Sequence, residues 1–281
     1  LGVTLQELGR LKEAEASYKQ AITLEPDYAR AFSNLGNTLK KLGRFEEAEA
    51  SYTKAITLEP NFAEAYNNLG NTLKELNRLE EAEASCRQAI VLKPDFAEAY
   101  NNLGSTLRDG GKLKEAETFY RQSIALKPDY AQAFNNLGVI MQKCHRFEEA
   151  RKIYTHATVL IPDYALAYCN LGITLQKLGL LKEAETSYRQ AILLKSDYAE
   201  AMLKLAIVLY YMNELKEVVG ILQNILLIDS DYFGLKAGVL LAIFCFLDDN
   251  IKMSKKYLMK TTHIWTKTSV EFKNEKLITD I

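Results

Sequence analysis

The stretch AEAYNNLGNTLKELNRLEEAEASCRQAIVLKPDF, residues 63–96, recurs with small changes on both sides of itself. Residues 29–62 read ARAFSNLGNTLKKLGRFEEAEASYTKAITLEPNF, and residues 97–130 read AEAYNNLGSTLRDGGKLKEAETFYRQSIALKPDY. Each copy is 34 residues long. Self-similarity at a fixed period of this size indicates one supersecondary unit that is stacked many times.

Each copy contains two amphipathic helical patterns. In the first half, Tyr66, Leu69 and Leu73 recur at spacings of three and four, which places them on one face of a helix. In the second half, Ala82 and Cys86 follow the same spacing. One unit alone buries little apolar surface, so we expect its stability to come from stacking against its neighbours.

The limits of the two helices are also predicted by the sequence. Asn77 lies between them, and glycine takes this place in the two neighbouring copies, which suits a left-handed helix cap. Pro94 is expected to end the second helix. Asp95 is expected to cap the next first helix, with Glu98 completing a capping box.

These residues resemble the tetratricopeptide repeat, which has aromatic-x2-Leu-Gly in its first helix, Ala-x3-aromatic in its second helix and then Pro. The Gly position is filled by Gly2, Gly36, Gly70, Gly104, Gly138 and Gly172. The Pro position is filled by Pro26, Pro60, Pro94, Pro128 and Pro162. The second-helix aromatic position is filled by Tyr18, Tyr52, Tyr120, Tyr154 and Tyr188, with Cys86 as the exception. The resemblance implies an all-α, right-handed superhelical solenoid of about seven to eight antiparallel helical hairpins, whose first helices line a concave groove.

The repeats divide most of the chain. The array is expected to occupy residues 1–232, with a truncated first repeat at 1–28 and repeats at 29–62, 63–96, 97–130, 131–164, 165–198 and 199–232. Residues 233–265 are predicted to form a diverged capping hairpin, and residues 266–281 a tail or the start of a following domain. Because Leu1 and Gly2 fall on the seventh and eighth positions of a repeat, we expect the chain to continue into a longer protein.

Composition argues against several classes of function. The formal net charge is −1 and the pI about 6.4, which does not favour nucleic acid as a partner. Four cysteines and three histidines are scattered without a CxxC motif, which predicts no disulfide framework and no metal site and suits a cytoplasmic protein. The apolar run at 233–247 is too short for a membrane span and contains Lys236. Nothing resembles a phosphate loop or a catalytic triad, so we expect no enzyme activity and no cofactor in these residues.

One asparagine recurs two residues after the first-helix aromatic residue of five repeats. Its copies are Asn34, Asn68, Asn102, Asn136 and Asn170. Asparagine is a poor residue for a helix interior, and its amide offers both donors and an acceptor. We therefore predict a solvent-facing asparagine ladder that holds the backbone of an extended peptide. The alternative is that a founder repeat was duplicated, in which case the five copies are not independent observations.

Other positions on the same face change along the array. Near its start they are polar or basic: Asn37, Asn71, Lys40, Lys74 and Arg108. Further on they are apolar or uncharged: Val139, Ile173, Ile207, Gln142, Gln176 and Tyr210. This gradient predicts a ligand with one polar or acidic end and one apolar end. Alternatively, a downstream domain or the end of the chain covers the apolar part.

A further subclass of the family holds a C-terminal carboxylate with Lys immediately before the ladder asparagine. Here that position is filled by Ser33, Asn67, Asn101, Asn135 and Cys169, which argues against a chaperone-tail receptor.

Two hypotheses about function follow. In the first, the chain is a protein–protein interaction module that binds an extended peptide or flexible protein segment in its groove. In the second, it is the substrate-recruiting arm of a larger transferase. The YNNLGN motif at 66–71 resembles the repeat domain of O-linked N-acetylglucosamine transferases, where the asparagine ladder is also found. A glycosyltransferase is therefore favoured, and a sulfotransferase or methyltransferase is possible. The oligomeric state is left open.

Overall fold

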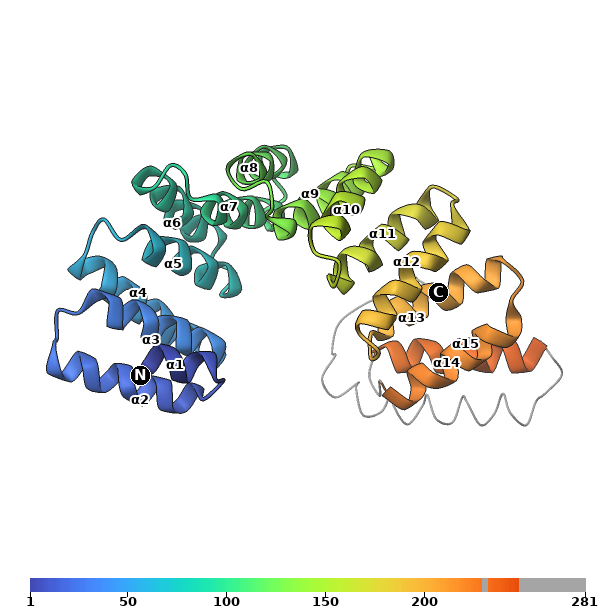
Figure 1. Cartoon of the computed structure of the whole chain (residues 1–281), viewed down its shortest axis with the longest axis horizontal. Coiled ribbons are helices and arrows are strands. Elements are labelled where there is room, and N and C mark those ends of the chain that lie inside the picture. The colour runs from blue at the N-terminus through green and yellow to red at the C-terminus, as the bar shows by residue number, and fades with distance from the viewer. Residues whose placement is uncertain (229–231, 248–281) are drawn as a thin grey trace. The chain divides into compact units, whose positions relative to one another are not determined.

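The computed structural model describes residues 1–228 and 232–247, and all of the regular structure in these ranges is α-helical (Figure 1). The first helices of the repeats are α1 (Gly2–Glu7), α3 (Ala29–Lys41), α5 (Ala63–Glu75), α7 (Ala97–Asp109), α9 (Ala131–Lys143), α11 (Ala165–Lys177) and α13 (Ala199–Tyr211). The second helices are α2 (Leu11–Leu24), α4 (Phe45–Leu58), α6 (Leu79–Leu92), α8 (Leu113–Leu126), α10 (Phe147–Leu160), α12 (Leu181–Leu194) and α14 (Leu215–Ile228). A further helix, α15, covers Tyr232–Leu247. The expected all-α array of about seven helical hairpins is thus confirmed.

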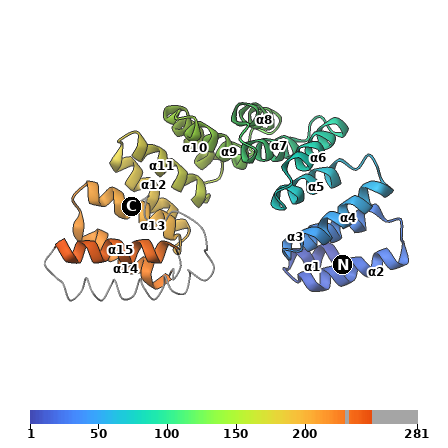
Figure 2. The ribbon, with the colours of Figure 1, turned by 180° about the vertical axis from the view of Figure 1, so that it is seen from behind.

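The chain divides by its internal contacts into two units, Leu1–Cys144 and His145–Ile281. In the first unit, α1, α3, α5 and α7 each pack on the second helix of their own repeat, and α3, α5, α7 and α9 also contact one another in succession (Figure 2). In the second unit, α11 pairs with α12 and α13 with α14, and α11 contacts α13. Consecutive first helices therefore form a continuous face within each unit.

The turns between paired helices follow the sequence prediction. Asn77 has φ 57°, and Gly43 and Gly111 have φ 74° and 77° at the same place in the neighbouring repeats. The backbone N–H of the following residue, Arg78, donates to Leu73 O over 2.9 Å, which closes the end of α5. A left-handed residue is therefore required here, a conformation that glycine and asparagine adopt at little cost.

The predicted capping box is wrong. Helix α7 begins at Ala97 with Phe96 as its N-cap, and no side chain caps it. Asp95 lies one residue too early, in the turn after Pro94, and its carbonyl accepts from the Ala97 N–H at 3.0 Å. Glu98 instead forms an ion pair with Lys127 at 2.8 Å. The carboxylate of this position therefore links the start of the first helix to the end of the second helix within one repeat.

The core lies where first and second helices cross. A Cβ atom added to Gly104 would lie 2.9 Å from the ring of Tyr120, and Gly36 and Gly172 face Tyr52 and Tyr188 in the same way. These tyrosine rings are fully buried. The recurring glycine is therefore needed because the aromatic ring of the second helix occupies the space of a side chain.

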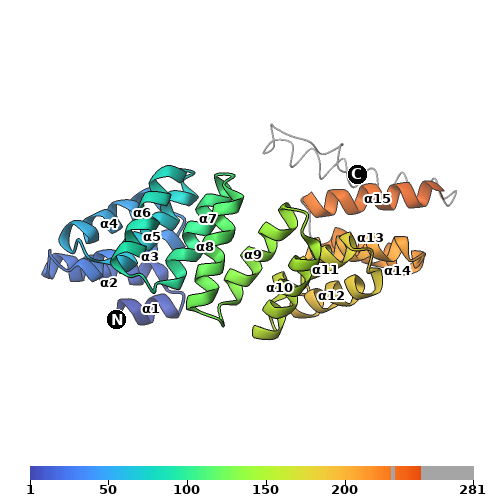
Figure 3. The same cartoon turned by 90° about the horizontal axis from the view of Figure 1, so that it is seen from above.

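Helix α15 packs against α13 and α14 (Figure 3). A first helix of the next repeat makes the same contacts, as α13 does with α11 and α12. The first half of the predicted capping hairpin is therefore helical. Its second half and the predicted tail at 266–281 lie outside the described residues.

A candidate peptide-binding face

The predicted asparagine ladder links successive repeats in the first unit. The Nδ2 of Asn102 donates to Asn67 Oδ1 over 2.9 Å, and the Nδ2 of Asn136 donates to Asn101 Oδ1 over 2.9 Å. Both ladder side chains are half-buried. The expectation that these amides point freely into solvent is therefore wrong. Each of these two amides donates one N–H to the preceding first helix. Its second N–H and its carbonyl oxygen remain available to other partners.

The two asparagines that accept these hydrogen bonds have no binding role predicted from the sequence. Asn67 and Asn101 are buried, with 6% and 1% of their surface exposed. An unpaired amide at such a site would be costly, which explains why each is matched by a donor from the following repeat. Two adjacent asparagines are unusual in a helix interior. Their adjacency is the sequence feature that could have indicated the buried amides.

Repeat 29–62 has Ser33 instead of the buried asparagine. Asn68 accordingly donates one turn further on, to Asn37 Oδ1 at 3.1 Å. The same oxygen accepts from the Tyr52 hydroxyl at 2.7 Å. Asn37 therefore has its acceptor fully used by the fold, and only its NH₂ group remains for a ligand.

Second-helix tyrosines also bond to first-helix side chains in other repeats. The hydroxyls of Tyr120 and Ser105 are 3.0 Å apart, and the Tyr188 hydroxyl donates to Gln176 Oε1 at 3.1 Å. Burial raises the pKa of Tyr120 and Tyr188, so these phenols stay neutral. Ser105 and Gln176 are thus tied to the core as well as placed on the first-helix face.

Asn71 differs because its repeat carries Cys86 in place of tyrosine. In the described part of the chain, the Asn71 side chain has no hydrogen-bond partner, and it is half-buried. The buried thiol of Cys86 lies instead against Gly70, where an added Cβ would be 2.5 Å from its Sγ. The exchange of tyrosine for cysteine therefore leaves a complete amide available on the face.

The predicted basic residues lie near Asn71. Lys74 is one turn along α5, 3.5 Å from the neighbouring carboxylate of Glu75. Lys40 on α3 is half-buried, and burial lowers its pKa, with Glu75 opposing and Lys74 reinforcing the change. Arg108 on α7 pairs with its neighbour Asp109 at 2.9 Å. The first unit thus presents three half-buried cations, and Lys40 forms no ion pair with any described residue.

Asn34 and Asn170 complete the predicted ladder. Asn34 is half-buried and lines a pocket of about 350 Å³ at the start of the array, together with Tyr28 and Ala31. Asn170 is half-buried on α11, in the second unit. The face is therefore populated by amides in both units.

The later positions are less uniform than the sequence suggested. Val139 is half-buried in the first unit. In the second unit, Ile173 and Gln176 line a pocket of about 520 Å³ with Lys204 and Tyr211. Tyr210 and Tyr211 are 50% and 66% exposed, with ring centroids 5.9 Å apart. This part combines aliphatic and aromatic surface with one cation at the position of the ladder asparagine.

Several acidic side chains of the described residues are used by the fold. No group of three or more His, Cys, Asp or Glu side chains within them could hold a metal ion. The acidic pairs that begin second helices serve the fold: Glu47 and Glu81 are bound by Arg44 and Arg78 three residues before them. None of the helices within residues 1–228 and 232–247 is long and apolar enough to cross a membrane.

Family models match along most of this array. Models described as "Tetratricopeptide repeat" match residues 29–62, 63–96 and 129–195, and one described as "TPR repeat" matches residues 3–43 and 104–143. The chain belongs to the tetratricopeptide-repeat family. The described residues thus form a repeat array of the kind that mediates protein–protein interactions.

Solved structures share this tetratricopeptide-repeat fold. The APC/C hetero-tetramer Cut9-Hcn1 matches with a TM-score of 0.70 at 20% identity, over 81% of this chain and 45% of that chain. The pilF protein of Pseudomonas aeruginosa matches with a TM-score of 0.64 at 19% identity, over 75% and 97%. YrrB, a TPR protein described as having an unusual peptide-binding site, matches with a TM-score of 0.50 at 23% identity, over 66% and 95%. This chain therefore spans less than half of the Cut9-Hcn1 chain. No curated protein matches the sequence.

Proposed function

We propose that the first-helix face of residues 1–144 binds an extended, acid-bearing segment of a partner protein. The observation that carries this proposal is the unpartnered amide of Asn71, close to the half-buried cations Lys40 and Lys74. A free amide can bond a peptide N–H and C=O together, and a desolvated ammonium group gains most from an added anion. YrrB supports the idea that this fold can present a peptide-binding site.

The other predicted residues support the same segment. Asn102 and Asn136 offer the N–H and carbonyl that the ladder leaves unused, and Asn34 and Asn37 extend the row of amides within residues 1–144. Arg108 adds a third cation on the same side. The ligand is therefore held along its backbone and selected by its acidic side chains, which suits a flexible segment that becomes ordered on binding.

The test begins with short random peptides displayed on phage and selected on the chain. The expected peptides are rich in Asp and Glu, and their affinity falls about tenfold when Asn71 is replaced by Ala. Lys40→Met should weaken the acidic peptides and spare versions in which Asp and Glu are changed to Asn and Gln. The proposal would be contradicted if the selected peptides are not enriched in Asp and Glu and bind the Asn71→Ala variant as tightly as the parent.

A second candidate is a substrate-recruiting arm of a transferase, with a glycosyltransferase favoured over a sulfotransferase or methyltransferase. The observation that favours it is the YNNLGN motif at 66–71. The peptide-binding face would then capture the protein that is modified. The mass of the native protein, captured from its source with an antibody to the array, tests this: a value near 31.8 kDa opposes it, and one tens of kilodaltons larger supports it.

A further inference from the structure

A row of ion pairs joins the second helices of the first unit. Glu15 pairs with Arg44 at 2.8 Å, and Glu49 with Arg78 at 2.7 Å. The third pair, Glu83 with Lys112, is 2.9 Å apart. In each case a carboxylate on one second helix meets the cation that precedes the next second helix. These ion pairs therefore link successive repeats through their second helices. We call the boundary between two consecutive second helices a seam.

Both partners of this pair are replaced between α10 and α12. Arg151 stands at the position of the carboxylate, and Leu180 at the position of the cation. Arg151 pairs with Glu148 of its own helix at 3.0 Å. The next seam, between α12 and α14, keeps an ion pair in another form, Arg189 with Glu217 at 2.7 Å. Among the seams described within each unit, the one between α10 and α12 therefore lacks an ion pair.

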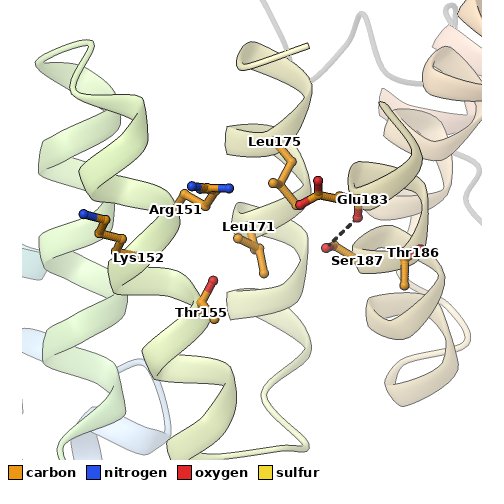
Figure 4. A pocket seen from close by; sticks show the side chains of 8 residues that line it. All are labelled: Arg151, Lys152, Thr155, Leu171, Leu175, Glu183, Thr186 and Ser187. Atoms are coloured by element: carbon orange, nitrogen blue, oxygen red, sulfur yellow. Dashed lines mark hydrogen bonds between the residues drawn. The ribbon is translucent and has the colours of Figure 1, made fainter. Parts of the chain in front are cut away.

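A cavity of about 610 Å³ opens at this seam (Figure 4). Arg151, Lys152 and Thr155 of α10 form one wall, and Glu183, Thr186 and Ser187 of α12 form the other. Leu171 and Leu175 of α11 lie between them as an apolar floor. We call this site the α10–α12 furrow.

The polar groups of the furrow divide unequally between its walls. Arg151 and Lys152 place two cations on the α10 side, and Lys152 forms no ion pair with any described residue. The Ser187 hydroxyl donates its hydrogen to the backbone oxygen of Glu183 over 2.9 Å. The carboxylate of Glu183 is the only charge that lines the α12 wall. A ligand is therefore favoured when its anionic group faces α10 and its apolar group faces the floor.

We propose that the α10–α12 furrow is a second docking site, for a partner-protein segment that carries an aliphatic side chain beside a carboxylate. The aliphatic group packs on Leu171 and Leu175, and the carboxylate binds Arg151 and Lys152. Glu183 repels the same carboxylate from the opposite wall and so fixes the direction of the segment. The volume suits one or two side chains of a peptide. The charged walls of this site lie on second helices, and the site belongs to the second unit and not to the first-helix face of residues 1–144.

The residues found at the other seams indicate the variant that tests this site most directly. Arg151→Glu combined with Leu180→Arg restores the residues of the other seams, so it should close the furrow with an ion pair and keep the fold. Lys177→Glu is a matched control, because it changes a charge on exposed surface of α11 outside the furrow. Circular dichroism and melting of each variant should match the parent, which confirms that the array stays folded.

The binding test uses displayed random peptides that are selected on the chain with Asn71 replaced by Ala. We expect peptides with an acidic residue next to Leu, Ile or Val. Their affinity should fall at least tenfold on the Arg151→Glu and Leu180→Arg variant and stay unchanged on Lys177→Glu. The proposal would be overturned if the selected peptides bind the Arg151→Glu and Leu180→Arg variant as tightly as the parent. It would also be overturned if the selection yields no acidic–aliphatic peptides. The first-helix face would be unaffected by either result.

Discussion

Asn102 donates its Nδ2 hydrogen to the buried Oδ1 of Asn67 over 2.9 Å, so an amide of one repeat satisfies an amide of the repeat before it. The same relation holds between Asn136 and Asn101. A row of residues that the sequence marks as a ligand-binding surface is thus also a connection between repeats. Stability in such arrays depends on interfaces between neighbours, so these amides contribute to folding as well as to the proposed binding.

Replacing Asn102 by Ala should lower the free energy of unfolding by about 1–3 kcal/mol. The substitution leaves the buried carbonyl of Asn67 without its donor, and an unsatisfied buried group costs more than the lost bond alone. Asn71→Ala is the matched control, because that amide has no partner to lose. Urea unfolding followed by circular dichroism measures both. Equal stability of the two variants would show that the ladder bond does not contribute.

The recurring glycine should tolerate no side chain where it faces a second-helix ring. Gly104→Ala places a Cβ 2.9 Å from the Tyr120 ring, and the ring has no room to move because it is fully buried. We expect a loss of about 1–3 kcal/mol from the forced repacking.

Gly110→Ala is the control for this substitution. Its Cβ would meet nothing closer than 3.5 Å, and its φ of −78° suits alanine. The change should be neutral or stabilise by about 0.5 kcal/mol through the unfolded chain. A thermal melt distinguishes the two variants, and a stable Gly104→Ala protein would contradict the packing argument.

The repeat period, the helix pairs and the recurring glycine position could be predicted because they depend on local spacing that recurs in every copy. The capping box could not, because Asp95 has the right residue type but sits one residue before the N-cap position, which Phe96 occupies. The partners of the amides were missed for another reason. Asn67 and Asn102 are 35 residues apart, so their contact depends on how two repeats stack and not on the pattern within one.

The exchange at Cys86 shows the same limit for the candidate site. The sequence marks Cys86 as a departure from tyrosine, but it does not show that the missing hydroxyl belonged to a bond with the first-helix face. Tyr52 and Asn37 reveal that bond in the preceding repeat. The consequence for Asn71 becomes visible only by comparing the two repeats in three dimensions.

Cys86→Tyr should therefore strengthen the fold and weaken the proposed binding together. The added ring would pack over Gly70, and its hydroxyl would donate to Asn71 as Tyr52 does to Asn37. We expect stabilisation of about 1 kcal/mol and a clear loss of affinity for peptides that depend on Asn71. Cys86→Phe adds the ring without the hydroxyl and should leave that affinity intact. If both variants bind peptides like the parent, Asn71 is not the anchor.

Alkaline pH should destabilise the array through its buried thiols. Burial raises the pKa of Cys86 and of Cys169 to about 12, from the ordinary 9.0. The unfolded chain therefore loses these protons first, and the free energy of unfolding falls as the pH rises through the window between the two values. Each thiol contributes a slope of about 1.4 kcal/mol per pH unit inside this window. Urea unfolding between about pH 9 and 10 measures the slope before most tyrosines of the unfolded chain ionise. The Cys86→Ala variant should show a shallower fall than the parent, and an unchanged slope would show that the thiol is not protected by the fold.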